Sequence, residues 1–248
     1  MNLRIAAIVV SVNLLFLVAA LAFFLRISFK RLYPSTIARK WTAFFTLAVV
    51  TVTGILGAWF YGLVGFIHSS ELPTLTTRVE FPFGSFGGYW GVILGSILAS
   101  FLCRVPQLSQ ADALVPGILV GGAVARLPGL FNEANPGITL HSEAFPWFQP
   151  FKYWAMYDIA IHLVVLLLVW QCSRRANSVP GLALAIFLVG YGLLRFCLEF
   201  VRIAQQVFGP FTYGHLMAAA QIVGGLILAM WLLRARETDL PLASTGGR

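Results

Sequence analysis

Residues 180–202 read PGLALAIFLVGYGLLRFCLEFVR, and this stretch decides the fold of the chain. A helix that crosses a membrane needs about 20 mainly apolar residues, which residues 180–200 supply. The stretch also holds Arg195, Glu199 and Arg202, although a guanidinium in hydrocarbon costs at least ~2.5–3.5 kcal/mol. Their spacing places the three charges on one helical face, where Glu199 can pair with both arginines. We therefore expect a membrane-crossing helix whose charged face is either a functional site or a structural ion-pair triad.

The composition of the whole chain extends this prediction to a bundle of such helices. The 248 residues are 59% hydrophobic and 10% charged, with a mean hydropathy of +0.84, which excludes a soluble globular domain. We expect an all-α polytopic membrane protein with roughly seven transmembrane helices. The apolar stretches that predict them are residues 5–25, 42–67, 87–103, 113–128, 154–171, 180–200 and 214–233.

The net charge of +8 reflects membrane topology rather than a nucleic-acid partner. Lys and Arg gather in alternate loops, which the positive-inside rule assigns to the cytoplasm. The N-terminus is then outside and the C-terminus is cytoplasmic. We expect one transmembrane domain over residues 1–236, with outer loops at about 68–86 and 129–153, and a flexible cytoplasmic tail at 237–248. The basic residues behind this assignment are Arg26, Lys30, Arg31, Arg39, Lys40, Arg104, Arg174, Arg175, Arg234 and Arg236.

Three further groups of residues are candidates for binding an anionic ligand. Arg126 ends the fourth apolar stretch, and a guanidinium matches a phosphate group with two parallel hydrogen bonds. The glycines of residues 84–91 either let a backbone approach a ligand or let two helices pack. Tyr157 and Asp158 are either an interfacial anchor or partners for an arginine. The histidines and cysteines have no metal-ligand spacing, so no metal site is expected.

At these residues the chain resembles the bacterial prolipoprotein diacylglyceryl transferase family. The family signature Gly-Arg-x-Gly-Asn-Phe-x-Asn-x-Glu-x-x-Gly is matched at Arg126, Asn132 and Gly137. The family run Arg-Phe-x-x-Glu-Phe-x-Arg is matched by residues 195–202. The other matches are Ser85, Gly87 and Gly88 in its Ser-Phe-His-Gly-Gly motif, Tyr157 and Asp158 at its Leu-Tyr-Glu, and Gln221 at its Gly-Gln pair.

The resemblance implies an enzyme of the bacterial cytoplasmic (inner) membrane that works without a cofactor. Such an enzyme transfers the diacylglyceryl group of phosphatidylglycerol to the lipobox cysteine thiol of lipoprotein precursors and releases glycerol phosphate. Its partners are phosphatidylglycerol, the precursor signal peptide and membrane lipids. The resemblance implies Arg126, Arg195 and Glu199 as catalytic residues. It implies substrate binding by Arg202, Asn132, Gly137, Ser85, Gly87, Gly88, Tyr157, Asp158 and Gln221.

The chain departs from the family pattern at one prominent position. Ser85-Phe86-Gly87-Gly88 has no counterpart of the histidine in the family motif, which is often assigned a catalytic role. Glu199, Glu133 and His141 are the candidates for a replacement base, and spacing singles out none of them. Two alternatives therefore stay open: a related enzyme that uses the same anionic-lipid cleft on another acceptor or donor, or a non-catalytic phospholipid-binding relative.

Overall fold

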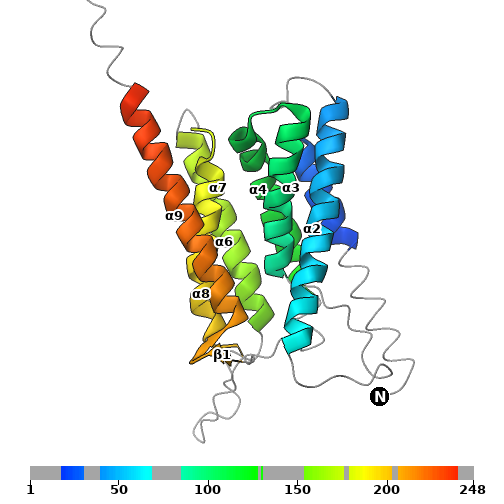
Figure 1. Ribbon diagram of the computed structural model, residues 1–248, viewed down its shortest axis with the longest axis vertical. Helices are drawn as coiled ribbons and strands as arrows, with labels where there is room; N and C mark the ends of the chain where they lie inside the picture. The colour runs from blue at the N-terminus through cyan, green and yellow to red at the C-terminus, as the bar shows by residue number, and fades with distance from the viewer. Residues whose placement is uncertain are drawn as a thin grey trace, which may run out of the picture. The chain divides into compact units, whose positions relative to one another are not determined.

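A computed structural model describes residues 18–30, 40–68, 85–127, 130, 154–175, 179–202 and 206–239. Residues 18–30 are helical, and Figure 1 labels most of the other elements. The helices are α2 (Lys40–His68), α3 (Ser85–Cys103), α4 (Gln107–Arg126), α6 (Trp154–Arg175), α7 (Leu182–Ile186), the π-helix η1 (Phe187–Tyr191), α8 (Gly192–Glu199) and α9 (Tyr213–Asp239). The strands are β1 (Gln206–Phe208) and β2 (Phe211–Thr212).

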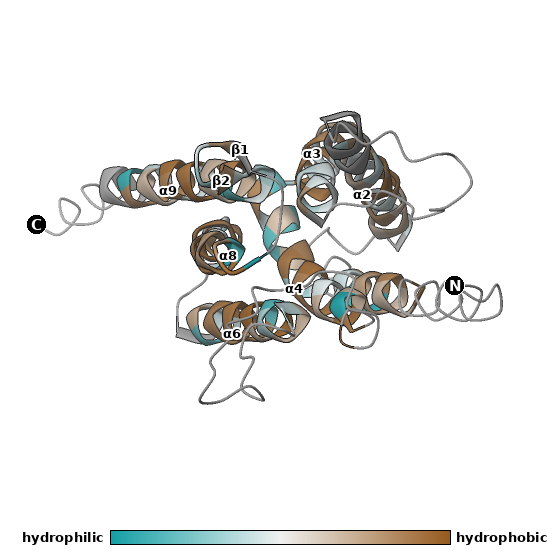
Figure 2. Ribbon diagram, turned by 90° about the horizontal axis from the view of Figure 1, so that it is seen from below, coloured by the Kyte–Doolittle hydropathy of each residue, from teal (hydrophilic) through white to brown (hydrophobic). Residues whose placement is uncertain are grey.

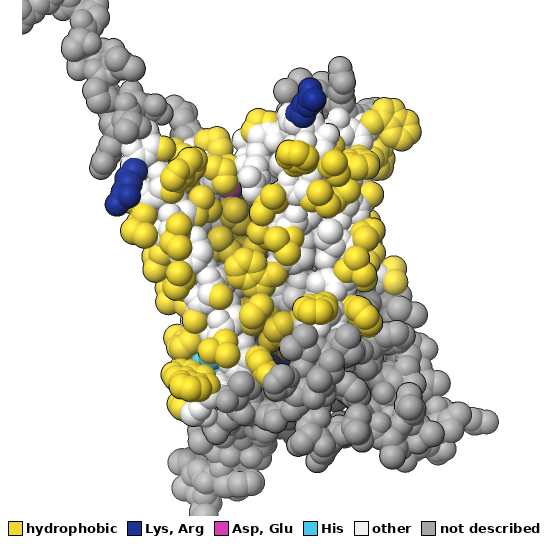
Figure 3. Space-filling view, in the orientation of Figure 1, with side chains coloured by type: hydrophobic (Ala, Val, Ile, Leu, Met, Phe, Trp, Pro, Cys, Tyr) yellow, Lys and Arg dark blue, Asp and Glu magenta, His cyan; other side chains and the backbone are white. Residues whose placement is uncertain are grey.

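Within the described residues, six segments are long and apolar enough to cross a membrane. The protein is therefore an all-α polytopic membrane protein, as predicted, with one short hairpin added. Figure 2 shows that hydrophobic residues dominate the helices, and Figure 3 shows hydrophobic side chains along the visible helix surfaces. Outward-facing apolar side chains suit lipid as the solvent. The six segments are Trp41–Tyr61, Phe86–Cys103, Gln107–Arg126, Trp154–Ser173, Leu182–Glu199 and Tyr213–Ala235.

The observed helix bounds differ most from the expected ones at the start of α4 and at the end of α9. The fourth segment begins at Gln107 rather than at residue 113, because the helix continues through the polar residues before Asp112. The last helix runs to Asp239, three residues into the expected tail at 237–248. Residues 1–17, which hold most of the first expected span, lie outside the described part of the chain, as do residues 240–248. Membrane orientation and the single-domain division remain predictions.

The chain divides into two compact units, the first made of Met1–Val18 and Ala123–Arg248 and the second of Ala19–Gly122. In the second unit, α2 and α3 pack backbone against backbone. A Cβ atom at Gly57 would clash with the carbonyl oxygen of Gly87 and would lie 3.0 Å from the Cα of Gly91. A Cβ atom at Gly91 would lie 2.9 Å from the Cα of Gly54. Small residues allow this approach, which maximises van der Waals contact where no hydrophobic force drives helices together.

A second close approach joins residues 18–30 to α4. A Cβ atom at Gly121 would lie 3.1 Å from the carbonyl oxygen of Ala20, and one at Gly117 would lie 3.0 Å from that of Phe24. Gly117 and Gly121, four residues apart, therefore serve packing, as small residues at this spacing do in membrane helices. Pro116 stands inside α4, where a proline cannot donate the usual backbone hydrogen bond.

In the first unit, α7, η1 and α8 form one continuous span over Leu182–Glu199, which contacts both α6 and α9. The five-residue π-helix Phe187–Tyr191 widens the middle of this span. Insertions of this kind re-aim side chains and are frequent at functional sites. Beyond α8, β1 and β2 pair antiparallel through a tight turn at Gly209, whose φ of 56° suits glycine. The hairpin leads directly into α9.

Alanine substitutions in α3 distinguish the two interpretations of its glycines. We expect Gly91→Ala to lower the free energy of unfolding by about 1–3 kcal/mol, because the new methyl group overpacks a backbone contact. Gly88→Ala is the matched control, since its Cβ atom would lie 3.6 Å from the Cβ of Ala58, an ordinary contact. Thermal unfolding in detergent measures both. Equal stability of the two variants would contradict the close α2–α3 packing.

Candidate anion-binding site

Five charged side chains of the first unit form a chain of alternating sign. Arg126 at the end of α4 pairs with Asp158 of α6, with 2.6 Å between Nε and Oδ2. Asp158 also lies 3.8 Å from Nε of Arg195. Arg195 pairs with Glu199 one turn later on α8, and Nη1 of Arg202 donates to Glu199 over 3.1 Å. The pairing of Glu199 with both arginines confirms the prediction from their spacing.

Exposure varies along this chain of charges in a way that matters for binding. The side chains of Asp158 and Glu199 are fully buried and that of Arg195 is 2% exposed, whereas Arg126 and Arg202 are 19% and 29% exposed. A buried charge is tolerated only when it is paired and hydrogen-bonded. The middle of the chain is thus held by its own ion pairs. The two end arginines retain partial access to a ligand.

Trp154, the first residue of α6, lies against all three guanidinium groups. Its ring centroid is 5.6 Å from Cζ of Arg126, 4.5 Å from Cζ of Arg195 and 5.3 Å from Cζ of Arg202. The indole is 1% exposed, and its Nε1–H donates to the carbonyl oxygen of Leu198 over 3.3 Å. The arginines therefore gather around one aromatic ring whose orientation is fixed by α8.

The hairpin and the start of α9 hold Glu199 from the other side. Thr212 donates its hydroxyl to Oε1 of Glu199 over 2.9 Å, and its backbone N–H donates to Nδ1 of His215 over 3.1 Å. The Glu199 carboxylate lies against Gly214, where a Cβ atom would be 2.5 Å from its Cδ and 2.9 Å from Oε2. A helix N-terminus favours negative charge. Glycine at this position therefore lets the carboxylate reach the N-terminus of α9.

A layer of aromatic and polar groups supports Asp158. His162 lies one turn along α6, and its Nδ1 is 2.7 Å from the carbonyl oxygen of Asp158. The hydroxyl of Tyr191, at the end of η1, donates to Oδ1 of Asp158 over 3.5 Å. The rings of His162 and Tyr191 meet edge to face, with centroids 4.9 Å apart. His162 is thus a hydrogen-bonded core residue, and Asp158 is an arginine partner rather than an interfacial anchor.

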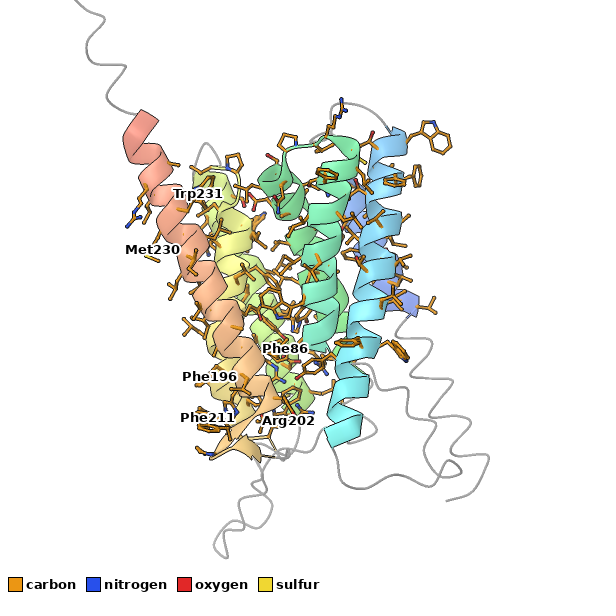
Figure 4. The ribbon with its side chains drawn as sticks, in the orientation of Figure 1. Phe86, Phe196, Arg202, Phe211, Met230 and Trp231 are labelled. Carbon is orange, nitrogen blue, oxygen red and sulfur yellow. The ribbon has the colours of Figure 1, made fainter. Side chains whose placement is uncertain are left out.

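Arg202 lies at the hairpin end of the first unit (Figure 4). Figure 4 shows it at the same end as Phe196 and Phe211, whereas Trp231 lies toward the opposite end of α9. Phe211 packs on the ring of His215, with centroids 5.5 Å apart. Burial lowers the pKa of Arg202 from its usual value, but a guanidinium still remains charged at neutral pH.

The structure describes only some of the other site residues that the sequence predicts. Gly87 serves the α2–α3 contact, because a Cβ atom there would clash with the carbonyl oxygen of Gly57, and the side chain of Ser85 lies outside the described part of the chain. Asn132 and Gly137 also lie outside it. Tyr157 is half-buried on α6. Their proposed roles in substrate binding stay predictions.

Gln221 is a deeply buried polar residue of α9. It is 1% exposed, and neither its Nε2 nor its Oε1 has a hydrogen-bond partner among the described residues. It lies seven residues after Gly214, so both face the same side of the helix. A buried carboxamide without partners is costly in an apolar environment, which is consistent with the predicted substrate contact.

Sequence reasoning did not identify Trp154, Thr212 or Gly214 as parts of the site. A tryptophan at a helix start next to a proline-rich loop is typical of a membrane interface, so the pattern favoured an anchor. Thr212 and Gly214 reach Glu199 only through the hairpin, which has no long strand pattern. The threonine three residues before His215 at a helix start is the one local signal, since it is typical of an N-cap.

The arrangement is suited to binding an anion. Among the described residues of the cluster, three guanidinium groups meet two carboxylates, which leaves positive charge in an apolar environment. Guanidinium groups bind phosphate and carboxylate with paired hydrogen bonds. Among all the residues that the structure describes, no three His, Cys, Asp or Glu side chains are grouped so as to hold a metal ion.

Comparison with known proteins identifies the family to which the chain is similar. The family model described as prolipoprotein diacylglyceryl transferase matches residues 3–231. Curated relatives named phosphatidylglycerol–prolipoprotein diacylglyceryl transferase include those of Tropheryma whipplei and Pseudomonas putida, each 30% identical. They align with 86% and 77% of this chain and with 85% and 76% of their own lengths. The relative of Pseudoalteromonas atlantica is 28% identical over 65% of this chain, and the chain spans 64% of its length.

The contact between Gly214 and Glu199 can be tested by alanine substitution. We expect Gly214→Ala to lower the free energy of unfolding by about 1–3 kcal/mol, because the methyl group displaces the carboxylate from its partners. Gly224→Ala on the same helix is the control, since a Cβ atom there meets nothing within 4 Å. Chemical or thermal unfolding in detergent measures the difference. An unaffected Gly214→Ala protein would show that Glu199 is not held at the start of α9.

Proposed function

The chain belongs to the prolipoprotein diacylglyceryl transferase family, and on that premise we propose that it transfers the diacylglyceryl group of phosphatidylglycerol to the cysteine thiol of a lipoprotein precursor. The released product is glycerol phosphate. The observation that carries the proposal is the alternating chain of charges in a multi-pass membrane protein, with a partly exposed arginine at each end. Such a chain provides positive charge for a lipid phosphate at membrane depth.

The reaction in this proposal is a displacement at the terminal glycerol carbon of the lipid. The cysteine sulfur forms a bond to that carbon while the bond from the carbon to the phosphate oxygen breaks. The electron pair of the broken bond leaves on the phosphate, and the thiol proton leaves to a base or to water. The reaction therefore needs a thiolate and positive charge near the departing phosphate.

The arginines meet the second of these needs. We place Arg126 and Arg195 on the departing phosphate, because both contact Asp158 and both lie on the ring of Trp154. Preorganised charges in an apolar site stabilise a developing anion strongly. Arg202 is the more exposed of the end arginines and adds a contact to the substrate.

The thiolate requirement is less demanding. A free thiol has a pKa of about 8.5, so a few per cent is ionised near neutral pH, and nearby guanidinium groups increase that fraction. Glu199 accepts hydrogen bonds from Arg195, Arg202 and Thr212. These contacts favour a positioning role for Glu199 over that of a base. Glu133 and His141 lie outside the described residues, so the base remains unassigned.

The membrane placement belongs to the same proposal. We place the protein in the bacterial inner membrane with its N-terminus outside, as the positive-inside rule predicts. Arg202 and the hairpin then lie toward the outer face, together with the loops at 68–86 and 129–153. A precursor whose cysteine follows an apolar signal segment reaches the site from this side of the membrane.

The direct test is a transfer assay with purified protein. Vesicles containing phosphatidylglycerol and a lipobox peptide are expected to give lipidated peptide and glycerol phosphate, detected by mass spectrometry. Arg126→Ala is expected to lower the rate about 10²–10³-fold, the usual effect of removing one charge-stabilising donor. Vesicles of phosphatidylethanolamine are the lipid control.

Three results would redirect the proposal. Absence of product above the Arg126→Ala background would overturn it. Changed lipids in a deletion strain, with lipoprotein acylation intact, would indicate a related enzyme acting on another donor or acceptor. Retention of phosphatidylglycerol without turnover would indicate a phospholipid-binding relative.

Gln221 gives a second test, in which stability and activity respond in opposite directions. Gln221→Leu removes a buried carboxamide that has no hydrogen-bond partner among the described residues, so the free energy of unfolding is expected to stay level or to rise by about 1–3 kcal/mol. Transfer is expected to fall about 2- to 10-fold, the loss of one neutral hydrogen bond. Gln110→Leu is the contrast, because Nε2 of Gln110 donates to the carbonyl oxygen of Ser96 over 3.1 Å and its loss should destabilise the protein. A destabilised Gln221→Leu protein would contradict this interpretation.

A further inference from the structure

We propose that Trp154 is a positioning residue for lipid recognition: its indole ring gathers the three guanidinium groups at one place, so that their positive charges act together on a phosphodiester. The inference rests on the proposed function and adds a residue to it. Trp154 touches no reacting atom and acts through Arg126, Arg195 and Arg202. The ligand class is a lipid with a monoanionic phosphodiester.

The three guanidinium groups lie around a single ring. All three Cζ atoms lie 4.5 to 5.6 Å from one ring centroid, within the roughly 6 Å limit for an energetically useful cation–π contact. The ring is 1% exposed, so water does not weaken the contacts. Its Nε1–H is anchored on the carbonyl oxygen of Leu198, which sets the plane of the ring relative to α8.

The guanidinium groups on this ring carry like charges. Like charges repel strongly in an apolar environment, and two carboxylates, Asp158 and Glu199, separate the three guanidinium groups. A further carboxylate would also hold the arginines together. It would also lower the net positive charge of the cluster.

An aromatic ring stabilises a guanidinium differently. The negative face of the ring attracts the cation through its flat side, whereas phosphate is bound at the edge through parallel N–H donors. The two interactions therefore do not compete. Tryptophan gives a stronger cation–π contact than the other aromatic residues. This difference explains why an indole is buried here, although a smaller side chain could also fill the space. In the structure, that indole lies where all three guanidinium groups converge.

The test changes the charge distribution of the ring while its shape and N–H group stay the same. Mono-, di- and trifluorotryptophan are incorporated site-specifically at Trp154, because each fluorine weakens the negative face of the ring. Trp231 is the matched control, being 56% exposed and lying toward the end of α9 opposite Arg202 (Figure 4). Binding of phosphatidylglycerol, KM for the lipid and kcat are measured for each protein, with thermal stability alongside.

We expect the Kd and the KM for phosphatidylglycerol to rise stepwise with the number of fluorines at Trp154, by roughly 2- to 30-fold across the series, the range that cation–π energies imply. We expect kcat to change less than KM, and the Trp231 series to stay flat. A Trp154 series with unchanged Kd and KM would overturn the inference, as would a series in which thermal stability alone falls, since that marks a space-filling role.

Binding and turnover separate this inference from the proposed function. If the wild-type protein makes lipidated peptide and fluorination at Trp154 leaves Kd and KM unchanged, the inference fails and the proposed function stands. If no lipidated peptide forms and the affinity for phosphatidylglycerol still depends on fluorination, the proposed function fails and the role of Trp154 in phosphodiester binding stands.

Discussion

The ion pairs of Asp158 are the interaction on which the functional part of this protein depends. One carboxylate joins Arg126 at the end of α4 to Arg195 on α8, and it is fully buried. Removing one partner of a buried pair typically costs about 3–5 kcal/mol, because the other charge is left uncompensated. The pairs thus hold Arg126 close to Arg195, and they bring positive charge from separate helices to one place.

The membrane explains why this polar cluster is so completely paired. Lipid offers no hydrogen bonds, so each charged group must find its partners within the protein. Glu199 illustrates the outcome, with hydrogen bonds from two arginines and from Thr212. The helices themselves associate through close packing of small residues, as Gly57 and Gly91 show in the α2–α3 contact. Polar pairing and glycine packing therefore act in different parts of the same chain.

The site is assembled from local irregularities in otherwise regular helices. The π-helix that ends at Tyr191 directs a hydroxyl to Asp158, and the hairpin carries Thr212 back to Glu199. Gly214 leaves room for the carboxylate at the start of α9. Each irregularity departs from the ideal pattern of its helix or turn, as is typical of functional sites. Trp154 adds an aromatic ring on which the three guanidinium groups converge.

The sequence by itself determined the helical membrane fold and the pairing within residues 195–202, because both follow from local rules: an apolar stretch long enough to span lipid, and charges spaced by one helical turn. It also predicted that Arg126 is a site residue. Only the tertiary structure decided that Asp158 joins Arg126 to Arg195, and that Trp154 and Gly214 belong to the cluster. Those contacts connect residues far apart in the chain, so they depend on how the helices pack, which periodicity and composition do not encode.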